Sequence, residues 1–269
     1  MEPHEKSGKQ QTIFHYLDFN PEGSPAVLLL HGLGADGSSW GYQIPALCEA
    51  GIRPIAPDLP GFGKTIPGEG RWTVAKAAED TSRLIYGLVG GPMVVAGISL
   101  GGVVALQLAL DFPQMVQRLI LINTFACLRP KRFDEASYLL GRFVVANLRG
   151  KEYQAETVAK RLFPQPDQEG LRRELVQQIL QADERVYRQA MQSLALFDVR
   201  KRLHEIKMPA LIISGENDTT VPLPNQMELV HGIAGAEHVI IPDAGHAVIA
   251  DQVTKFNQVL LSYLKSQTY

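Results

Sequence analysis

The chain has 269 residues, 45% of them hydrophobic and 20% charged, which is the ordinary balance of a soluble globular protein. Its formal net charge of −2 provides no basic field, which argues against nucleic acid or an anionic membrane as a partner. Residues 1–10 are polar and lack the apolar segment of a secretory signal. No stretch reaches the roughly 20 apolar residues of a membrane span. We therefore expect a cytoplasmic protein in which Cys48 and Cys127 are reduced thiols.

The first predicted element is a strand over residues 12–19, turning back at residues 20–23 into an antiparallel hairpin at a sheet edge. Short, almost continuously apolar runs follow, as expected for parallel strands buried on both faces. Several are separated by helical spacing of apolar residues. This alternation predicts an α/β fold, with a mostly parallel central sheet flanked by helices. The apolar runs are residues 27–30, 53–56, 93–96, 119–122, 210–213 and 238–241, and the clearest helical patterns are 74–88, 103–110 and 253–264.

The alternation stops between residues 125 and 199, where only helix-like segments are found. One of them carries an apolar stripe formed by Leu171, Leu175, Val176, Ile179 and Leu180. A segment of this length exceeds what a crossover between parallel strands needs. We therefore expect a helical cap or lid at 125–199, inserted into a core made of residues 1–124 and 200–269.

A serine between glycines, in Gly97-Ile98-Ser99-Leu100-Gly101, lies between a predicted strand and a predicted helix. The five residues match G-x-S-x-G, the nucleophile-elbow pattern, in the context that it requires. A tight strand-to-helix turn strains the backbone at the serine, and the glycines remove side chains that would collide there. The helix start also brings free N–H groups and positive partial charge toward the hydroxyl. The pattern predicts that Ser99 is a catalytic nucleophile.

A serine nucleophile needs a base, and the chain has seven histidines. His246 follows the last predicted strand in Asp243-Ala244-Gly245-His246, at the edge where the carboxyl ends of the strands open into a site. A histidine in that turn can reach a serine on a neighbouring strand-end loop, so we predict His246 as the base. Five others lie in a tail or in strand-like or helix-like segments, where a surface or packed role is expected: His4, His15, His204, His231 and His238.

The base in turn needs an acid that orients it. Asp218 follows the predicted strand at 210–213, in Gly215-Glu216-Asn217-Asp218, and we predict it as this acid. Glu216 is the rival in the same loop. Asp243 lies only three residues before His246, which is too close in sequence for a partner that reaches the ring from a separate loop. Asp58 is expected to bind backbone N–H groups in its own turn instead.

An acyl-transfer site also needs donors for the developing oxyanion. His31-Gly32-Leu33-Gly34 follows the strand at 27–30, and its glycines allow close approach to a substrate. The backbone N–H groups of Leu33 and Leu100 are the predicted oxyanion hole. His31 itself is expected to brace the loop.

Together these parts resemble the α/β-hydrolase superfamily over nearly the whole chain. The resemblance implies a triad of Ser99 as nucleophile, His246 as general base and Asp218 as its orienting acid, and it implies that residues 125–199 are the lid that shapes the substrate pocket. The matching pieces are His31-Gly32-Leu33-Gly34, Asp58-Leu59-Pro60-Gly61-Phe62-Gly63, Gly97-Ile98-Ser99-Leu100-Gly101-Gly102, Gly215-Glu216-Asn217-Asp218 and Gly245-His246.

A serine at the nucleophile position limits the types of reaction that this family resemblance implies. Relatives that cleave carbon–halogen bonds or epoxides use aspartate as nucleophile, whereas serine with histidine indicates acyl transfer. Ile122-Asn123-Thr124 is similar to the enol-lactonase and small-ester branch. We expect a serine esterase acting through an acyl-enzyme on carboxylic esters, or on related lactones or thioesters. Two alternatives stay open: a carbon–carbon bond hydrolase with the same triad, and a ligand-binding receptor of this fold with little turnover.

The expected partner is a small-molecule ester or lactone; no metal and no cofactor is expected, and monomer or homodimer stays open. Arg129, Lys131 and Arg132 form a basic stretch, which we expect to be a turn exposed to solvent. The alternative is that a cation of this stretch binds an acidic group of the substrate. Apolar residues of the lid and the strand-end loops are the pocket candidates: Trp40, Phe125, Leu139, Phe143, Leu196, Phe197, Val221 and Val248.

Overall fold

The computed structural model describes residues 10–128 and 150–266. Its centre is a seven-stranded sheet in the order β1-β3-β2-β4-β5-β6-β7, in which β1 is antiparallel to β3 and all other neighbours are parallel. The predicted α/β fold with a mostly parallel central sheet is thus confirmed. The strands are β1 (Tyr16–Asp18), β2 (Ala26–Leu30), β3 (Arg53–Pro57), β4 (Met93–Ile98), β5 (Val116–Ile122), β6 (Ala210–Gly215) and β7 (Glu237–Ile241).

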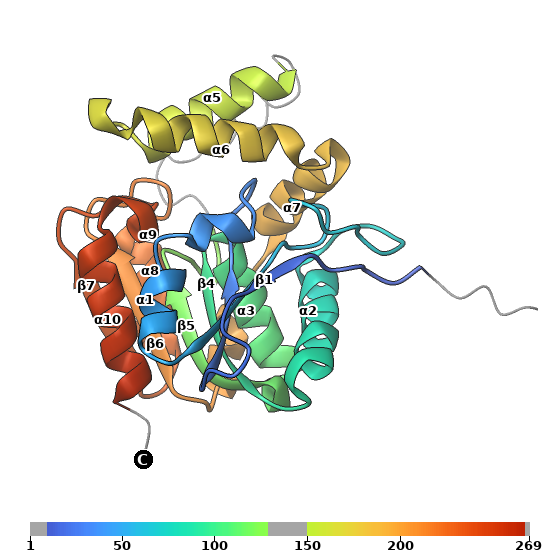
Figure 1. The fold of residues 1–269 in the computed structure, drawn as a ribbon, viewed down its shortest axis with the longest axis vertical. Coiled ribbons are helices and arrows are strands. Elements are labelled where there is room, and N and C mark those ends of the chain that lie inside the picture. Colours follow the sequence, from blue (N-terminus) through green and yellow to red (C-terminus); the bar gives the residue numbers. More distant parts are fainter. Residues whose placement is uncertain (1–9, 129–149, 267–269) are drawn as a thin grey trace, which may run out of the picture.

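Helices cover both faces of this sheet (Figure 1). On one face pack α2, α3 and α8, and on the other α1, α9 and α10. None of the described helices is long and apolar enough to cross a membrane. The α-helices are α1 (Ile44–Glu49), α2 (Val74–Val89), α3 (Leu100–Asp111), α5 (Gly150–Leu162), α6 (Glu169–Gln181), α7 (Glu184–Leu196), α8 (Leu223–Gly232), α9 (Val248–Asp251) and α10 (Val253–Lys265). Short 3₁₀ turns are η1 (Gly37–Trp40), η2 (Pro113–Met115), η3 (Pro166–Gln168) and η4 (Arg200–Glu205).

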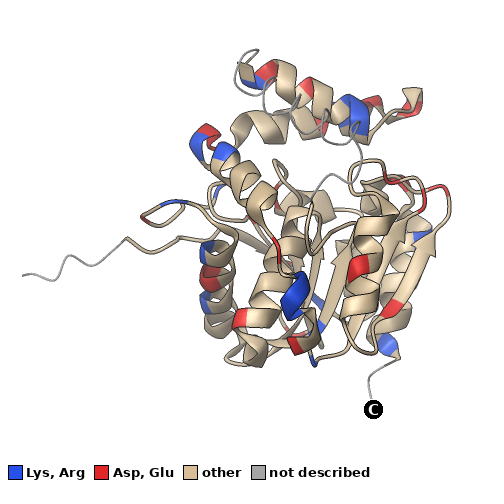
Figure 2. Ribbon diagram, turned by 180° about the vertical axis from the view of Figure 1, so that it is seen from behind, with Lys and Arg blue, Asp and Glu red and all other residues tan. Residues whose placement is uncertain are grey.

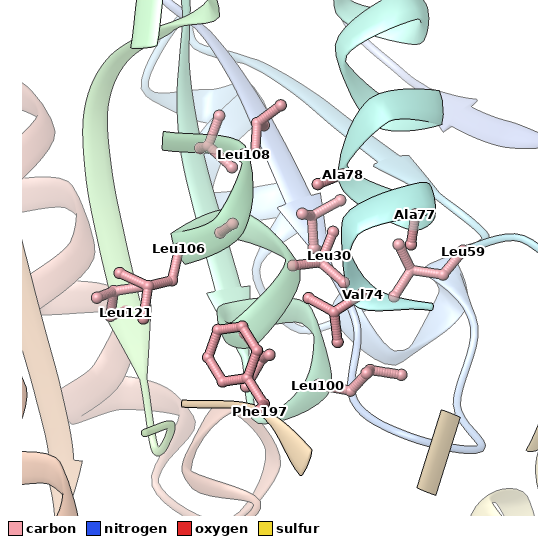
Figure 3. Close-up of a cluster of buried hydrophobic side chains, with 14 of the residues drawn as sticks. Leu30, Leu59, Val74, Ala77, Ala78, Leu100, Leu106, Leu108, Leu121 and Phe197 are labelled. Carbon is pink, nitrogen blue, oxygen red and sulfur yellow. The ribbon is translucent and has the colours of Figure 1, made fainter. Parts of the chain in front are cut away.

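The apolar strands form two cores because successive side chains point to opposite faces of a strand. In β2, Leu28 and Leu30 join the core under α2 and α3, whereas Val27 and Leu29 join the core under α1 and α10. All four side chains are fully buried. Figure 3 shows part of the first core, where Leu30 lies with residues of α2 and α3. Charged residues of both signs lie mainly on the helices, and the strands carry few of them (Figure 2).

The predicted amino-terminal hairpin is wrong. The strand β1 is antiparallel and lies at a sheet edge, but it pairs with β3, with Tyr16 opposite Pro57 and Asp18 opposite Ile55. The physical reason is that both edges of β2 are already taken by β3 and β4. An ion pair between Arg53 and Asp18, 2.7 Å from Nη2 to Oδ2, supports the observed pairing.

The helices α5, α6 and α7 lie over the carboxyl ends of the strands (Figure 1). The helix α7 is joined to the core by bonds from backbone N–H groups: Trp72 to Gln189 Oε1 at 2.8 Å and Val74 to Ser193 Oγ at 3.0 Å. On the opposite side, Arg161 of α5 donates to the carbonyl of Thr219 at 2.6 Å. These three helices thus roof the sheet edge where the predicted site residues lie; the division into core and lid stays a prediction.

Candidate functional site

The turn at Ser99 connects β4, which ends at Ile98, to α3, which begins at Leu100. Its backbone angles, φ 54° and ψ −115°, lie in a region that residues other than glycine rarely adopt. The surrounding structure holds this conformation: the Ser99 N–H donates to the Ile122 carbonyl at 3.0 Å, and the Ser99 carbonyl accepts from Thr124 Oγ1 at 2.8 Å. The predicted strained strand–turn–helix is therefore present at Ser99.

Close backbone approach explains the glycines on either side. A Cβ at Gly97 would lie 2.3 Å from the carbonyl oxygen of Gly101. A Cβ at Gly101 would lie 2.2 Å from the carbonyl oxygen of Leu30, on the neighbouring strand β2. Both are far inside van der Waals contact with backbone that cannot move aside, so only glycine fits at these positions.

The second feature is a carboxylate–imidazole pair. His246 Nδ1 lies 2.8 Å from Asp218 Oδ2, and both side chains are buried. The other oxygen, Asp218 Oδ1, accepts from the N–H groups of Thr220 at 2.8 Å and Val221 at 2.9 Å, which fixes the carboxylate. A proton on Nδ1 shared with this carboxylate leaves Nε2 as the proton-accepting nitrogen of the ring.

The rival acids have other contacts. Glu216 Oε2 accepts from the backbone N–H of Asp243 at 3.0 Å, at an exposed position. Asp58 accepts from the N–H of Gly37 at 2.8 Å and of Lys64 at 2.8 Å, as expected of a turn residue. Of the acids considered from the sequence, the structure thus brings Asp218 to the His246 ring.

Two further residues hold the loop of His246, and sequence reasoning did not assign them this role. Asn123, at the end of β5, donates to the carbonyls of Gly245 and His246. Asp251 Oδ2 accepts from the N–H of Gly245 at 2.7 Å, and burial raises the pKa of the Asp251 carboxyl above its ordinary value. The available signal was the position of Asn123 at the end of a central strand, beside the strand that carries Asp218.

The predicted oxyanion donors belong to two segments beside Ser99: Leu100 follows it in the chain, and the loop of Leu33 adjoins it, since a Cβ at Gly32 would lie 3.8 Å from the Ser99 Cβ. Leu100 is the first residue of α3, where backbone N–H groups have no partner within the helix, and its side chain is buried in the core. Leu33 lines the cavity described below. The loop of Leu33 is braced by His31, whose Nδ1 donates to the Gly32 carbonyl at 2.8 Å and whose Nε2 accepts from the Leu59 N–H at 2.8 Å. Burial lowers the pKa of His31, which favours the neutral ring that these bonds require.

Ser99 and His246 open into one cavity of about 180 Å³ between the sheet edge and the helices α5, α6 and α7. Its lining is mostly apolar, and among the described residues Arg161 and Glu174 are the Lys, Arg, Asp or Glu side chains that line it. Residues of the roof and of the strand-end loops share the lining: Leu33, Ile98, Phe125, Leu128, Val158, Leu162, Phe163, Leu171, Leu175, Leu194, Val221 and Ile249.

The pocket candidates divide into three groups. Phe125 and Val221 line the cavity. Trp40, Phe197 and Val248 are buried in the two cores and do not line it, and neither does Leu196, whose side chain is 82% exposed. Outside the described residues lie Leu139 and Phe143, as well as Arg129, Lys131 and Arg132. Within residues 10–128 and 150–266, no cluster of three or more His, Cys, Asp or Glu side chains is arranged to hold a metal ion.

Comparisons with known proteins agree with this geometry. The protein named carbamate hydrolase RutD of Yersinia enterocolitica is 31% identical over 94% of this chain and 93% of its own length. A 2-hydroxy-6-oxononadienedioate/2-hydroxy-6-oxononatrienedioate hydrolase of Paraburkholderia phymatum is 28% identical, over 96% of this chain and 92% of its own. The crystal structure of an enol-lactonase from Burkholderia xenovorans superposes with a TM-score of 0.84 at 26% identity, covering 94% of this chain and 97% of that one. The family model described as alpha/beta hydrolase fold matches residues 25–252, and the chain therefore belongs to the alpha/beta hydrolase family.

Proposed function

We propose that the protein is a serine hydrolase that cleaves carboxylic esters, including lactones, through an acyl-enzyme. The observation that carries this proposal is the common cavity of Ser99 and His246, in which the His246 ring is oriented by Asp218. A strained nucleophile position, an oriented base and an apolar binding space are the parts that acyl transfer needs.

The proposed reaction has two halves. His246 Nε2 takes the proton of Ser99 Oγ while this oxygen attacks the ester carbonyl carbon, and the N–H groups of Leu33 and Leu100 stabilise the resulting oxyanion. The carbon–oxygen bond to the alcohol breaks, and the alcohol leaves with the proton from His246. Water then attacks the acyl group on Ser99 by the same route, releasing the acid and restoring the serine.

The apolar lining of the cavity favours an ester with apolar groups over the carbamate and the dienedioate that are named for two relatives. A dioate carries two carboxylates, whereas Arg161 is the one Lys or Arg among the described lining residues, and it donates to the Thr219 carbonyl at 2.6 Å. A small polar carbamate would leave the apolar walls provided by Leu175, Leu194 and Val221 without contact. Binding of an apolar acyl chain or alcohol group takes both the apolar wall and the substrate out of contact with water, which is favourable.

The test compares three substrate classes with one preparation of the protein. We would measure kcat/KM for p-nitrophenyl esters of increasing acyl length, for p-nitrophenyl carbamates and for the dienedioate 2-hydroxy-6-oxononadienedioate. The proposal expects the highest kcat/KM for an ester and loss of that activity in Ser99→Ala. Ser214→Ala is the matched control, because it also removes a serine hydroxyl beside a histidine, with Ser214 Oγ 3.0 Å from His238 Nε2, but away from the cavity.

Two outcomes would overturn the ester proposal. A higher kcat/KM for the dienedioate or for carbamates would assign the same triad to a different bond. Tight binding of esters without turnover would indicate a receptor of the same fold.

A further inference from the structure

We propose that Asn123 is the positioning residue for the catalytic base, joining the loop of His246 to the loop of Asp218; this inference rests on the proposed function. Asn123 follows β5 and is completely buried. Its Nδ2 donates to the carbonyl of Gly245 at 2.9 Å and to the carbonyl of His246 at 2.8 Å. Its Oδ1 accepts from the backbone N–H of Gly215 at 2.7 Å.

These bonds connect the two loops that carry the acid and the base. Gly215 ends β6 and precedes Asp218, while Gly245 and His246 follow β7. The backbone of Asn123 is itself fixed to β6, because its N–H donates to the Ile213 carbonyl at 3.0 Å. The two loops are also joined by a backbone bond from the Asn217 N–H to the Ala244 carbonyl at 2.8 Å. The buried Asn123 side chain adds bonds at Gly215, Gly245 and His246, and so helps to set the distance between the loops that must bring Asp218 Oδ2 and His246 Nδ1 together.

Only an amide satisfies all three partners at this position. A carboxylate could accept from Gly215, but it has no N–H to offer the carbonyls of Gly245 and His246. An apolar residue would leave two buried carbonyls and one buried N–H without partners, which is costly. Asn123 also has a φ of 43°, a left-handed conformation that asparagine tolerates better than most residues.

Asp251 completes the support from the other side. Its Oδ2 accepts from the N–H of Gly245, whose carbonyl accepts from Asn123, so the residue before His246 is held at both of its polar groups. With its loop fixed in this way, the His246 ring has to reach Asp218 at one end and Ser99 at the other. A displacement of about 1 Å at such a site can cost on the order of 10²-fold in rate.

The test deletes this amide and a matched amide elsewhere. Asn123→Gly removes the three bonds without straining the left-handed backbone. Asn20→Ala is the control, because Asn20 also donates from Nδ2 to a backbone carbonyl, that of Ile52 at 3.0 Å, just before β3 and therefore at the other end of the strands from the site. Both variants are compared for thermal unfolding, for kcat and KM with p-nitrophenyl butyrate, and for the far-downfield proton NMR signal of His246 Nδ1.

We expect Asn123→Gly to lower kcat by about 10²-fold with little change in KM, and to shift or broaden the Nδ1 proton signal. Asn20→Ala should keep both the rate and the signal, even where its Tm falls equally. If Asn123→Gly does not fold, Asn123→Asp keeps the size and the acceptor for Gly215 but lacks both N–H groups, and the same changes are expected.

An unchanged Nδ1 signal in the Asn123 variants, or an equal loss of kcat in Asn20→Ala, would overturn the positioning role. The signal also separates the two proposals. If wild type proves inactive on every ester, the loss of the signal in Asn123→Gly and its persistence in Ser99→Ala still support positioning of His246 by Asn123.

Discussion

Asp218 Oδ2 and His246 Nδ1 lie 2.8 Å apart across 28 residues of sequence, with both side chains buried. In the proposed mechanism, this contact holds one tautomer of the ring and stabilises the positive charge that His246 acquires as the base. We predict that Asp218→Asn lowers kcat on the order of 10⁴-fold, as the same change does in other serine triads. The measurement is steady-state hydrolysis of the best p-nitrophenyl ester.

The matched control is Glu216→Gln, in the same loop. Glu216 Oε2 accepts from the backbone N–H of Asp243 at an exposed position, whereas the His246 ring contacts Asp218, so the loss of the Glu216 carboxylate should change kcat less than about tenfold. Equal losses in the two variants would contradict Asp218 as the orienting acid.

The turn around Ser99 leads to a prediction about stability. Gly101→Ala should destabilise the protein by about 3 kcal/mol, because the new methyl would meet the Leu30 carbonyl at 2.2 Å on rigid backbone. Gly87→Ala lies on the open side of α2, where a new Cβ would meet no other part of the protein within 4 Å. This change should stabilise the folded protein by about 0.5 to 1 kcal/mol. Urea unfolding of both variants beside wild type measures the difference, and a Gly101→Ala midpoint equal to that of wild type would show that the turn can relax.

A third prediction concerns pH and His31. Burial holds the pKa of His31 below its ordinary value of 6.5. As the pH falls through about 6.5, the unfolded chain therefore takes up a proton that the folded chain does not. The contribution of His31 to stability is present above that pH and is lost below it. We expect the free energy of unfolding to decline on acidification, and His31→Gln to make this decline shallower while costing about 1 to 3 kcal/mol at pH 8.

The control for this experiment is His204→Gln, because His204 is exposed on η4 and its ring stays in water. Its pH dependence of unfolding should follow that of wild type more closely. If His31→Gln retains the full acid-side slope, burial of a neutral His31 is not the source of that slope.

Much of the fold could be predicted from local patterns. The unbroken apolar runs predict parallel strands because buried faces on both sides leave no position for polar residues, and β2, with four fully buried side chains at 27–30, is an example. The partner of β1 could not be predicted in this way. Tyr16–Asp18 has no sequence signal for β3, and its pairing follows from the occupation of both edges of β2.

The candidate site also has parts that local sequence patterns predict and parts that depend on packing. Ser99, Asp218 and His246 follow strands, and residue type with spacing was enough to select them. The structure brings Asp218 to the His246 ring and opens Ser99 and His246 into one cavity, while their catalytic roles stay a prediction. The cavity wall was harder, because Phe125 and Trp40 are both large, apolar and buried, yet packing puts Phe125 in the cavity wall and Trp40 against Phe256 in the core. Asn123 shows the same limit, since three hydrogen bonds to distant backbone leave no mark in its neighbouring sequence.

The most direct test of the central claim is to trap the acyl-enzyme. The protein is mixed with p-nitrophenyl acetate, quenched in acid within the first turnovers, and digested for peptide mass spectrometry. The account predicts one acetyl group per chain, located on Ser99, absent from Ser99→Ala and retained in Ser214→Ala. Ester hydrolysis that continues in Ser99→Ala, or an acetyl group located on another residue during turnover, would contradict the assignment of Ser99 as the nucleophile.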